Sequence, residues 1–180
     1  DKVAAMGIVM KINMIAALVL VGFAFGGQPL IGYNYGAKNR ERLKGTLKFA
    51  YLFEGGLALV LMAVLGFFAP QLVRIFMSDP SVVENGALML RLQLAGMVFM
   101  GVVLISTCTF QSAGQAVGAF LLSVSRQGVI FAIVLNVALR VAGYHGVLAS
   151  QAISDLLTAA LAVVLVVRLS LIHISEPTRH

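Results

Sequence analysis

Long apolar stretches alternate with short polar segments along the 180-residue chain. A helix needs about 20 mostly apolar residues to cross the hydrocarbon core of a bilayer. Five stretches meet that requirement: residues 3–27, 49–69, 87–110, 117–139 and 147–167. Several of them are apolar all round, whereas a helix of a soluble bundle carries a polar stripe. The pattern therefore predicts an all-α fold, a polytopic membrane bundle of five transmembrane helices.

Composition supports a membrane protein and excludes other classes. Apolar residues make up 60% of the chain and charged residues 11%, with a mean hydropathy of +0.98 and a net charge of +6. The cations lie in one polar segment or singly inside apolar runs, so they form no basic face for nucleic acid. Cys108 is the single cysteine. It excludes an internal disulfide, and the scattered His145, His173 and His180 have no ligand spacing.

The sequence also lacks the residue patterns of common enzymes. It has no Ser/His/Asp set and no phosphate-binding glycine loop. We therefore expect neither catalytic activity nor a cofactor or metal, and transport is the function class that remains.

The two ends of the chain look unusual. The sequence starts at Asp1 without a basic region or a cleavage site, so we expect no signal peptide and a chain that is cut at its start. Residues 169–179 resemble the translation of a transposase adapter used in sequencing-library preparation. We therefore assign residues 169–180 to a non-native, adapter-derived tail, the alternative being a natural polar tail, and base function on residues 1–168.

The orientation signal lies in the segment 36–48, which carries five cations and one anion. Short loops rich in Lys and Arg stay in the cytoplasm, so this segment is predicted to be cytoplasmic. Alternation then places the polar segments after residues 69 and 139 outside, and the segment after residue 110 inside. Residues 71–77, between Pro70 and Pro80, are predicted to form a short interfacial helix on the outer side.

Ionisable groups inside a span cost about 2.5 to 3.5 kcal/mol each near its centre and need a partner or a wet cavity. Arg126 lies about 15 Å from the inner end of its helix and Asp155 about 12 Å from the outer end of the next, at a rise of 1.5 Å per residue. Matched depth on consecutive helices predicts an ion pair. The pair either only fixes the two helices or lies in the transport path, and Lys11, near Asn13, could compete for Asp155.

Helical spacing adds a polar-to-small face to Asp155. Gln151, Thr158 and Ala162 lie on the same side of the helix, so this face should point into the bundle or a cavity. Gln151 is therefore a further candidate for the substrate or ion path.

Two further features of the spans allow two interpretations each. Glu54 lies in the inner half of its helix. Either it carries a proton, as a carboxyl in apolar surroundings can, or its side chain leans towards the inner interface of the membrane.

Pro29 lacks an amide hydrogen, so the first helix is expected to kink or break there. Such a break could place free carbonyls at a cavity, or the helix could simply end in a glycine-rich exit.

Four sequence segments carry a family resemblance. Residues 27–44, GQPLIGYNYGAKNRERLK, are similar to a motif of the MATE family of multidrug and toxic-compound extrusion transporters, in its bacterial MepA-like branch. Residues 110–114 (FQSAG), 122–128 (LSVSRQG) and 151–158 (QAISDLLT) resemble the second half of that family. Together these segments extend the resemblance from the start of the chain to about residue 167.

The resemblance implies a fold and an activity. The family has twelve helices in two lobes around a central cavity, and it exchanges H+ or Na+ for organic cations and other drugs by alternating access. The five predicted helices correspond to the eighth through twelfth spans, so residues 1–168 would be a partial carboxy-terminal lobe. The resemblance also implies that several residues occupy motif positions of this lobe, most of them structural: Gln28, Pro29, Asn34, Gln111, Arg126, Gln127 and Asp155.

The expected function is therefore a fragment of a cation-coupled multidrug efflux antiporter in the bacterial inner (cytoplasmic) membrane. Its expected partners are membrane lipid, the missing amino-terminal lobe and small organic, often cationic, substrates. The family's best-supported cation site lies in the absent lobe, so no coupling-ion ligand transfers and H+ and Na+ both stay open. One alternative is a lipid-linked oligosaccharide flippase, which should have more cavity cations than Lys11 and Arg126. The other is a non-transporting membrane scaffold subunit, which has no need of paired charges at matched depth.

Overall fold

The computed structural model describes residues 2–175, with side chains for residues 3–168, and within that part the chain is helical and contains no strand. The elements follow in the order α1 (Lys2–Gly36), α2 (Arg40–Phe67), α3 (Ala69–Phe76), α4 (Pro80–Ala95), α5 (Met97–Ser112), α6 (Ala116–Val124), the π-helical turn η1 (Ser125–Val129) and α7 (Ile130–Ser175). The predicted all-α class is confirmed.

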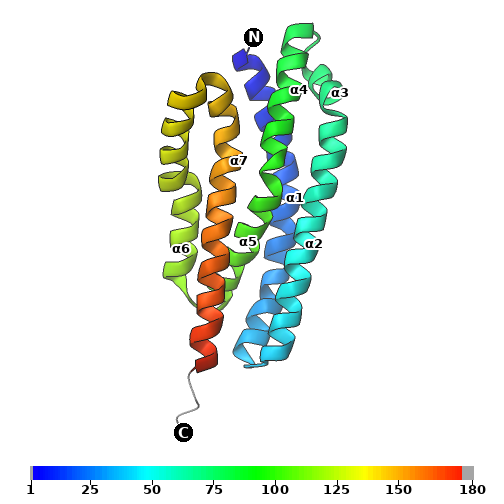
Figure 1. The fold of residues 1–180 in the computed structure, drawn as a ribbon. Helices are drawn as coiled ribbons and strands as arrows, with labels where there is room; N and C mark the ends of the chain where they lie inside the picture. Colours follow the sequence, from blue (N-terminus) through cyan, green and yellow to red (C-terminus); the bar gives the residue numbers. More distant parts are fainter. Residues whose placement is uncertain (1, 176–180) are drawn as a thin grey trace.

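Within the described residues, four helical stretches are long and apolar enough to cross a membrane: Val3–Gly36, Arg40–Phe67, Pro80–Ser112 and Ala116–Arg168. The last of them is a hairpin (Figure 1), because α7 is interrupted at Gly143, whose φ of 55° and ψ of −128° are not helical. Residues 116–142 form its first arm and residues 144–168 its second. The chain therefore passes along the bundle five times, as the hydropathy pattern predicts.

The first helix is longer than the apolar pattern predicts. The expected helix end at residue 27 is wrong and α1 does not break at Pro29, because α1 is a continuous helix to Gly36 with Pro29 inside it. A kink at Pro29, the other expected outcome, stays a prediction. A proline removes only one helical hydrogen bond, and its fixed φ is compatible with a helix. Contacts with α5 also hold this part of α1, since the Ser112 Oγ donates to the Gln28 carbonyl at 3.2 Å.

The predicted polar segment 36–48 is mostly helical. Only residues 37–39 connect α1 to α2, and α2 begins at Arg40 because the Asn39 side chain accepts a hydrogen bond from the Arg42 amide at 3.0 Å. A side chain of this type satisfies one of the free amides at a helix start. Four of the five cations of this segment thus lie in the first turns of α2, and Lys38 lies in the connection before it.

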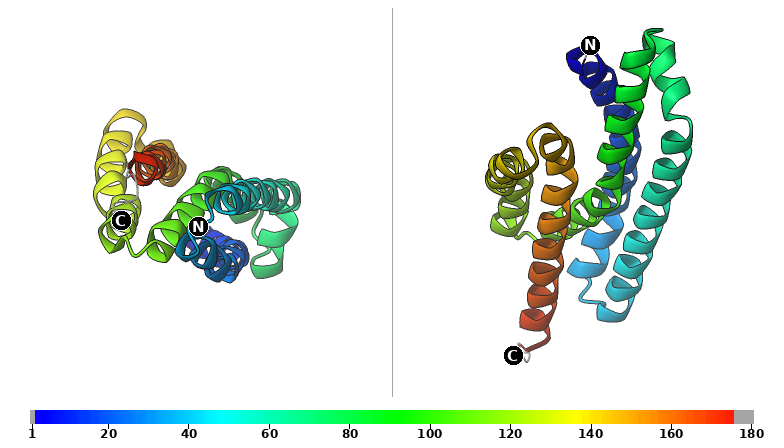
Figure 2. Two further views of the ribbon diagram at one scale, coloured as in Figure 1. Left: turned by 90° about the horizontal axis from the view of Figure 1, so that it is seen from below. Right: turned by 45° about the horizontal axis from the view of Figure 1, so that its top comes forward.

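The helices form two groups that α5 joins (Figure 2). One group contains α1 to α4, and the other is the hairpin of α6, η1 and α7. Small residues allow close packing, as expected for helices that associate in lipid. A Cβ at Gly86 of α4 would lie 3.0 Å from Val73 of α3, and one at Gly118 of α6 would lie 2.6 Å from the Phe110 ring of α5.

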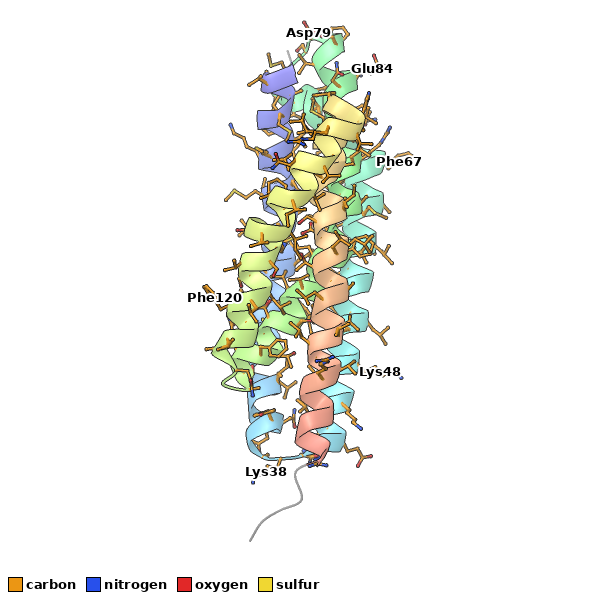
Figure 3. The ribbon with its side chains drawn as sticks, turned by 60° about the vertical axis from the view of Figure 1, so that its left-hand side comes forward. Lys38, Lys48, Phe67, Asp79, Glu84 and Phe120 are labelled. Carbon is orange, nitrogen blue, oxygen red and sulfur yellow. The ribbon has the colours of Figure 1, made fainter. Side chains whose placement is uncertain are left out.

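The two ends of the bundle carry different loops. Lys38 lies at one end, near the C-terminal end of α7, and Asp79 and Glu84 lie at the other end (Figure 3), where Figure 1 also places the turn at Gly143. This arrangement agrees with the predicted alternation of segments. The predicted short helix at 71–77 is also present, as α3.

Asp79 caps the start of α4 outside the apolar span. Its carboxyl accepts hydrogen bonds at 2.8 Å from both the amide and the hydroxyl of Ser81. These bonds, together with one from the Val82 amide, hold the pKa of Asp79 below its usual value. The cap explains why a helix starts directly at Pro80.

The adapter-derived assignment of residues 169–180 stays a prediction. The helical backbone of α7 continues past the predicted boundary at residue 168 to Ser175. The side chains of residues 169–175 and the whole of residues 176–180 lie outside the described residues.

Gly146 in the returning arm of α7 is expected to be intolerant of any side chain. A Cβ at this position would collide with the backbone carbonyl of Ala138 in the first arm. We therefore expect Gly146→Ala to open the hairpin and to lower the free energy of unfolding by about 1 to 3 kcal/mol, the usual cost of overpacking. The matched control is Gly7→Ala in α1, where a Cβ would meet no atom within 4 Å. Equal stability of the two variants in detergent-based unfolding would contradict the tight hairpin.

Candidate functional site

Arg126 and Asp155 form an ion pair inside the bundle, as their matched depth predicts. The Arg126 Nε lies 2.9 Å from the Asp155 Oδ1, and the two side chains are 16% and 4% exposed. The pair joins the two arms of the hairpin at about the middle of each arm. A buried pair of this kind needs good geometry and further hydrogen bonds to offset the loss of solvation.

The π-helical turn η1 positions Arg126. In this turn the Ile130 amide donates to the Ser125 carbonyl, five residues earlier, instead of four. The Arg126 carbonyl accepts a hydrogen bond from the Ser154 Oγ at 3.2 Å. Arg126 therefore contacts the returning arm through both its backbone and its side chain.

Asp155 is held from two sides. Its Oδ1 accepts the Arg126 bond and a second bond from the Gln151 Nε2 at 3.3 Å. Its Oδ2 faces the bend between α4 and α5, where a Cβ at Gly96 would lie 3.1 Å from that oxygen. The carboxylate thus connects the hairpin to the first helical group.

The predicted polar-to-small face of the returning arm does point into the bundle. Asp155, Thr158 and Ala162 are buried and Gln151 is half-buried. The Thr158 hydroxyl donates to the Ser154 carbonyl at 2.8 Å, so it is satisfied within its own helix. The face therefore packs against protein, with Gln151 at its partly open edge.

Lys11 does not compete for Asp155, so that alternative is wrong. The Lys11 side chain is exposed, and within residues 3–168 the ion pair of Asp155 is with Arg126. Asn13 is half-buried, and its Oδ1 has no hydrogen-bond partner among the described residues. A helical repeat alone cannot show which way a lone lysine points, because long side chains can reach outwards from the same depth.

Several motif residues join helices to each other. The Gln28 Nε2 of α1 donates to the Gln111 Oε1 of α5 at 3.2 Å. The buried Asn34 donates to the Leu30 carbonyl at 2.9 Å and to the Thr46 hydroxyl of α2 at 3.2 Å. These bonds fix α1 against α5 and α2.

Glu54 is buried, whereas Gln127 is exposed. Glu54 is fully buried between α2 and α5, so the alternative in which it leans towards the inner interface is wrong. Gln127 is exposed on η1 and takes no part in the ion-pair network around Asp155. Among the motif positions Asn34 is buried and Gln127 is exposed, so motif membership alone does not separate contact residues from surface residues.

The sequence pattern missed the glycines that shape this region. Gly96 separates α4 from α5 within a stretch predicted as one helix, and Gly101 allows Glu54 to pack on the α5 backbone. Their signal in the sequence is a glycine inside an apolar run.

Among the described residues, no group of three His, Cys, Asp or Glu side chains is arranged to hold a metal ion.

Comparison with known sequences places these features in a family. The MatE family model matches residues 1–139. The multidrug export protein MepA of Staphylococcus aureus (strain NCTC 8325 / PS 47) is 30% identical over 164 residues, and that of Staphylococcus haemolyticus (strain JCSC1435) is 28% identical over the same number. Both matches cover 91% of this chain and 36% of the relative. The chain thus spans little more than a third of the length of these curated relatives.

Solved structures share the fold. A MATE protein in complex with MaL6 superimposes with a TM-score of 0.87 at 20% identity, covering 96% of this chain and 40% of the other. An outward-facing MATE transporter of the MOP superfamily gives 0.87 with the same coverage, and an inward-facing one gives 0.85 over 94% of this chain and 40% of the other. Because the family model matches most of the sequence and these structures have the same arrangement of helices, the chain belongs to the MATE family.

Proposed function

We propose that the chain forms the carboxy-terminal lobe of a cation-coupled multidrug efflux antiporter that works by alternating access. The MepA relatives are named as multidrug export proteins, which supports the substrate class of small organic, often cationic, molecules. Its proposed partner is an amino-terminal lobe of the same transporter. The proposed location is the bacterial cytoplasmic membrane with the cationic segment 36–48 inside, as the positive-inside rule favours. The coupling ion is H+ or Na+.

One observation carries the alternating-access part of this proposal. The chain superimposes about equally on an outward-facing and an inward-facing relative, with TM-scores of 0.87 and 0.85. A lobe that rearranged internally between the two states would match only one of them well. The similarity therefore supports a lobe that rocks as a unit against its partner, as in other transporters built from repeats.

The ion pair of Arg126 and Asp155 is suited to keep such a lobe rigid. It joins both arms of the hairpin, and the Asp155 Oδ2 reaches the bend at Gly96 in the other helical group. Both donors to the Asp155 Oδ1 come from the hairpin itself. We therefore assign the pair to fixing the lobe, and Gln151 at the partly open edge to the side that faces a substrate path.

The rigid-lobe proposal is tested by distances between spin labels in the chain joined to an amino-terminal lobe from a MepA relative. Phe67→Cys in α2 and Val141→Cys in α7 are 74% and 81% exposed and belong to different helical groups. Cys108→Ser removes the native thiol. We expect the distance between these two labels to stay constant when substrate or a proton gradient shifts the transporter between its states.

The control measurement pairs Val141→Cys with a label on the amino-terminal lobe. That distance is expected to change between the two states while the distance within the lobe does not. A change within the lobe as large as the change between lobes would contradict rigid-body rocking.

A further inference from the structure

Glu54 has the least favourable surroundings of the acidic side chains in the described part of the chain. It is 0% exposed, and both carboxyl oxygens are buried without a hydrogen-bond partner. Buried carboxylates in proteins are paired or hydrogen-bonded in nearly all cases, because removing the charge from water is costly. Asp155 shows the usual solution in this same chain, with an arginine and a glutamine as donors.

The α2–α5 interface is closely packed at the Glu54 stem. A Cβ at Gly101 of α5 would lie 2.9 Å from the Glu54 Cγ, so the two helices are in close contact there. Hydroxyl groups of the same two helices are engaged elsewhere. The Tyr51 hydroxyl bonds to the Ser106 Oγ at 2.8 Å, and the Ser106 Oγ also donates to the Val102 carbonyl at 2.8 Å.

The titratable groups around this interface do not supply a counter-charge. On α2 and α5, near Glu54, they are Tyr51 and the buried thiol of Cys108, both neutral at pH 7 in their ordinary forms. Lys48 of α2 lies six residues before Glu54, about 9 Å along the axis, but its side chain is exposed and it forms no ion pair among the described residues. Arg126 of the hairpin is paired with Asp155.

On α1, the cation inside the apolar span is Lys11. The Phe23 ring of α1 stacks on the Phe53 ring of α2, with centroids 4.2 Å apart, so Glu54 lies at about the level of Phe23. Lys11 is twelve residues away from Phe23 on α1, which is about 18 Å along the helix axis.

The cations of α3 and α4 are equally remote. The Arg91 Nε of α4 donates to the Gly66 carbonyl at 2.9 Å, twelve residues beyond Glu54 on α2. This places Arg91 about 18 Å away along the axis. Glu84 lies near the start of α4, at the same end of the bundle as Asp79 (Figure 3), and Figure 1 places α3, which carries Arg74, towards that end. An ionised Glu54 would therefore be both unsolvated and unpaired.

We propose that Glu54 is a proton-binding site inside the lobe, occupied by a proton while α2 and α5 are packed as in this structure. A neutral carboxyl leaves one O–H donor unsatisfied, which costs far less than an unpaired charge. Release of the proton requires a local opening at the carboxyl that admits water or a cation, which movement of the lobe as a unit does not supply. The ligand is H+ rather than Na+, because hard cations take several oxygen ligands and no hydroxyl of the described residues lies within hydrogen-bond distance of the Glu54 oxygens.

This inference concerns the chain itself and stands whether or not the chain takes part in transport. The test is infrared spectroscopy of the purified chain in lipid nanodiscs, with 13C-labelled glutamate carboxyls to separate them from aspartate. We expect the C=O band of one protonated glutamate to persist at pH 6, well above the ordinary glutamate pKa of about 4.3. The band should be absent from Glu54→Gln.

A second variant assigns the band without changing Glu54. Glu41→Gln, Glu84→Gln and Glu176→Gln combined leave Glu54 as the only glutamate of the sequence. This variant is expected to keep the band at full intensity. A spectrum that shows only ionised glutamate at pH 6 in this variant would overturn the proposal, and so would loss of the band on adding Na+ at constant pH, which would indicate a cation site.

Discussion

Replacing Asp155 with alanine is expected to lower the free energy of unfolding by about 3 to 5 kcal/mol. The reason is that Arg126, whose side chain is only 16% exposed, would keep its charge without a partner. The Gln151 amide and the Gly96 bend would lose their contact with the carboxylate at the same time. Unfolding of the chain in detergent with increasing sodium dodecyl sulfate measures the loss.

The double variant distinguishes pairing from a general loss of packing. Arg126→Met together with Asp155→Ala removes both charges, so it should be more stable than Asp155→Ala alone. Lys11→Met is the matched control, since it removes an exposed cation from another helix and should change little. Losses that simply add in the double variant would show that the two charges do not depend on each other.

The ion pair could be predicted from sequence because two simple quantities determine it. Depth in a membrane follows from the helical rise, and consecutive helices joined by a short turn are neighbours. The approach fails for Lys11, which has a similar depth to Asp155 but points to the outside of the bundle. Depth fixes position along a helix, whereas the facing direction depends on which helices pack together.

Helix ends and bends were harder to predict, because hydropathy reports lipid contact and not backbone geometry. The pattern ends the first helix before Pro29, but packing against α5 lets α1 continue to Gly36. The hydropathy pattern also predicts one helix over residues 87–110, where Gly96 separates α4 from α5. The π-helical turn at residues 125–129 has no hydropathy signal, yet it brings Arg126 onto the returning arm.

The surroundings of Glu54 could not be predicted from the sequence. Its position in an apolar helix allowed either a proton carrier or a side chain that leans towards the interface. Only the packing of α2 on Gly101 reveals a carboxyl that is fully buried and has no hydrogen-bond partner among the described residues. The difference depends on a glycine 47 residues later in the chain, which no local pattern connects to Glu54.

The second prediction with a large expected effect is the loss of drug transport when the chain is expressed alone. Residues 1–168 alone are expected to insert into the membrane but to show no drug efflux, because alternating access requires two lobes that move around a site between them. The chain covers 40% of the matched outward-facing transporter. The returning arm, with Asp155 and Thr158 on its inner face, can form only one wall of such a path.

Efflux from cells that carry residues 1–168 tests this account most directly, when it is compared with efflux from cells that also express an amino-terminal lobe from a MepA relative. The account predicts background efflux for the chain alone and drug efflux that depends on an ion gradient when both lobes are present. Equal levels of the chain in both membranes are the necessary control. Ion-coupled drug efflux by residues 1–168 alone would contradict the account and favour a self-assembling dimer.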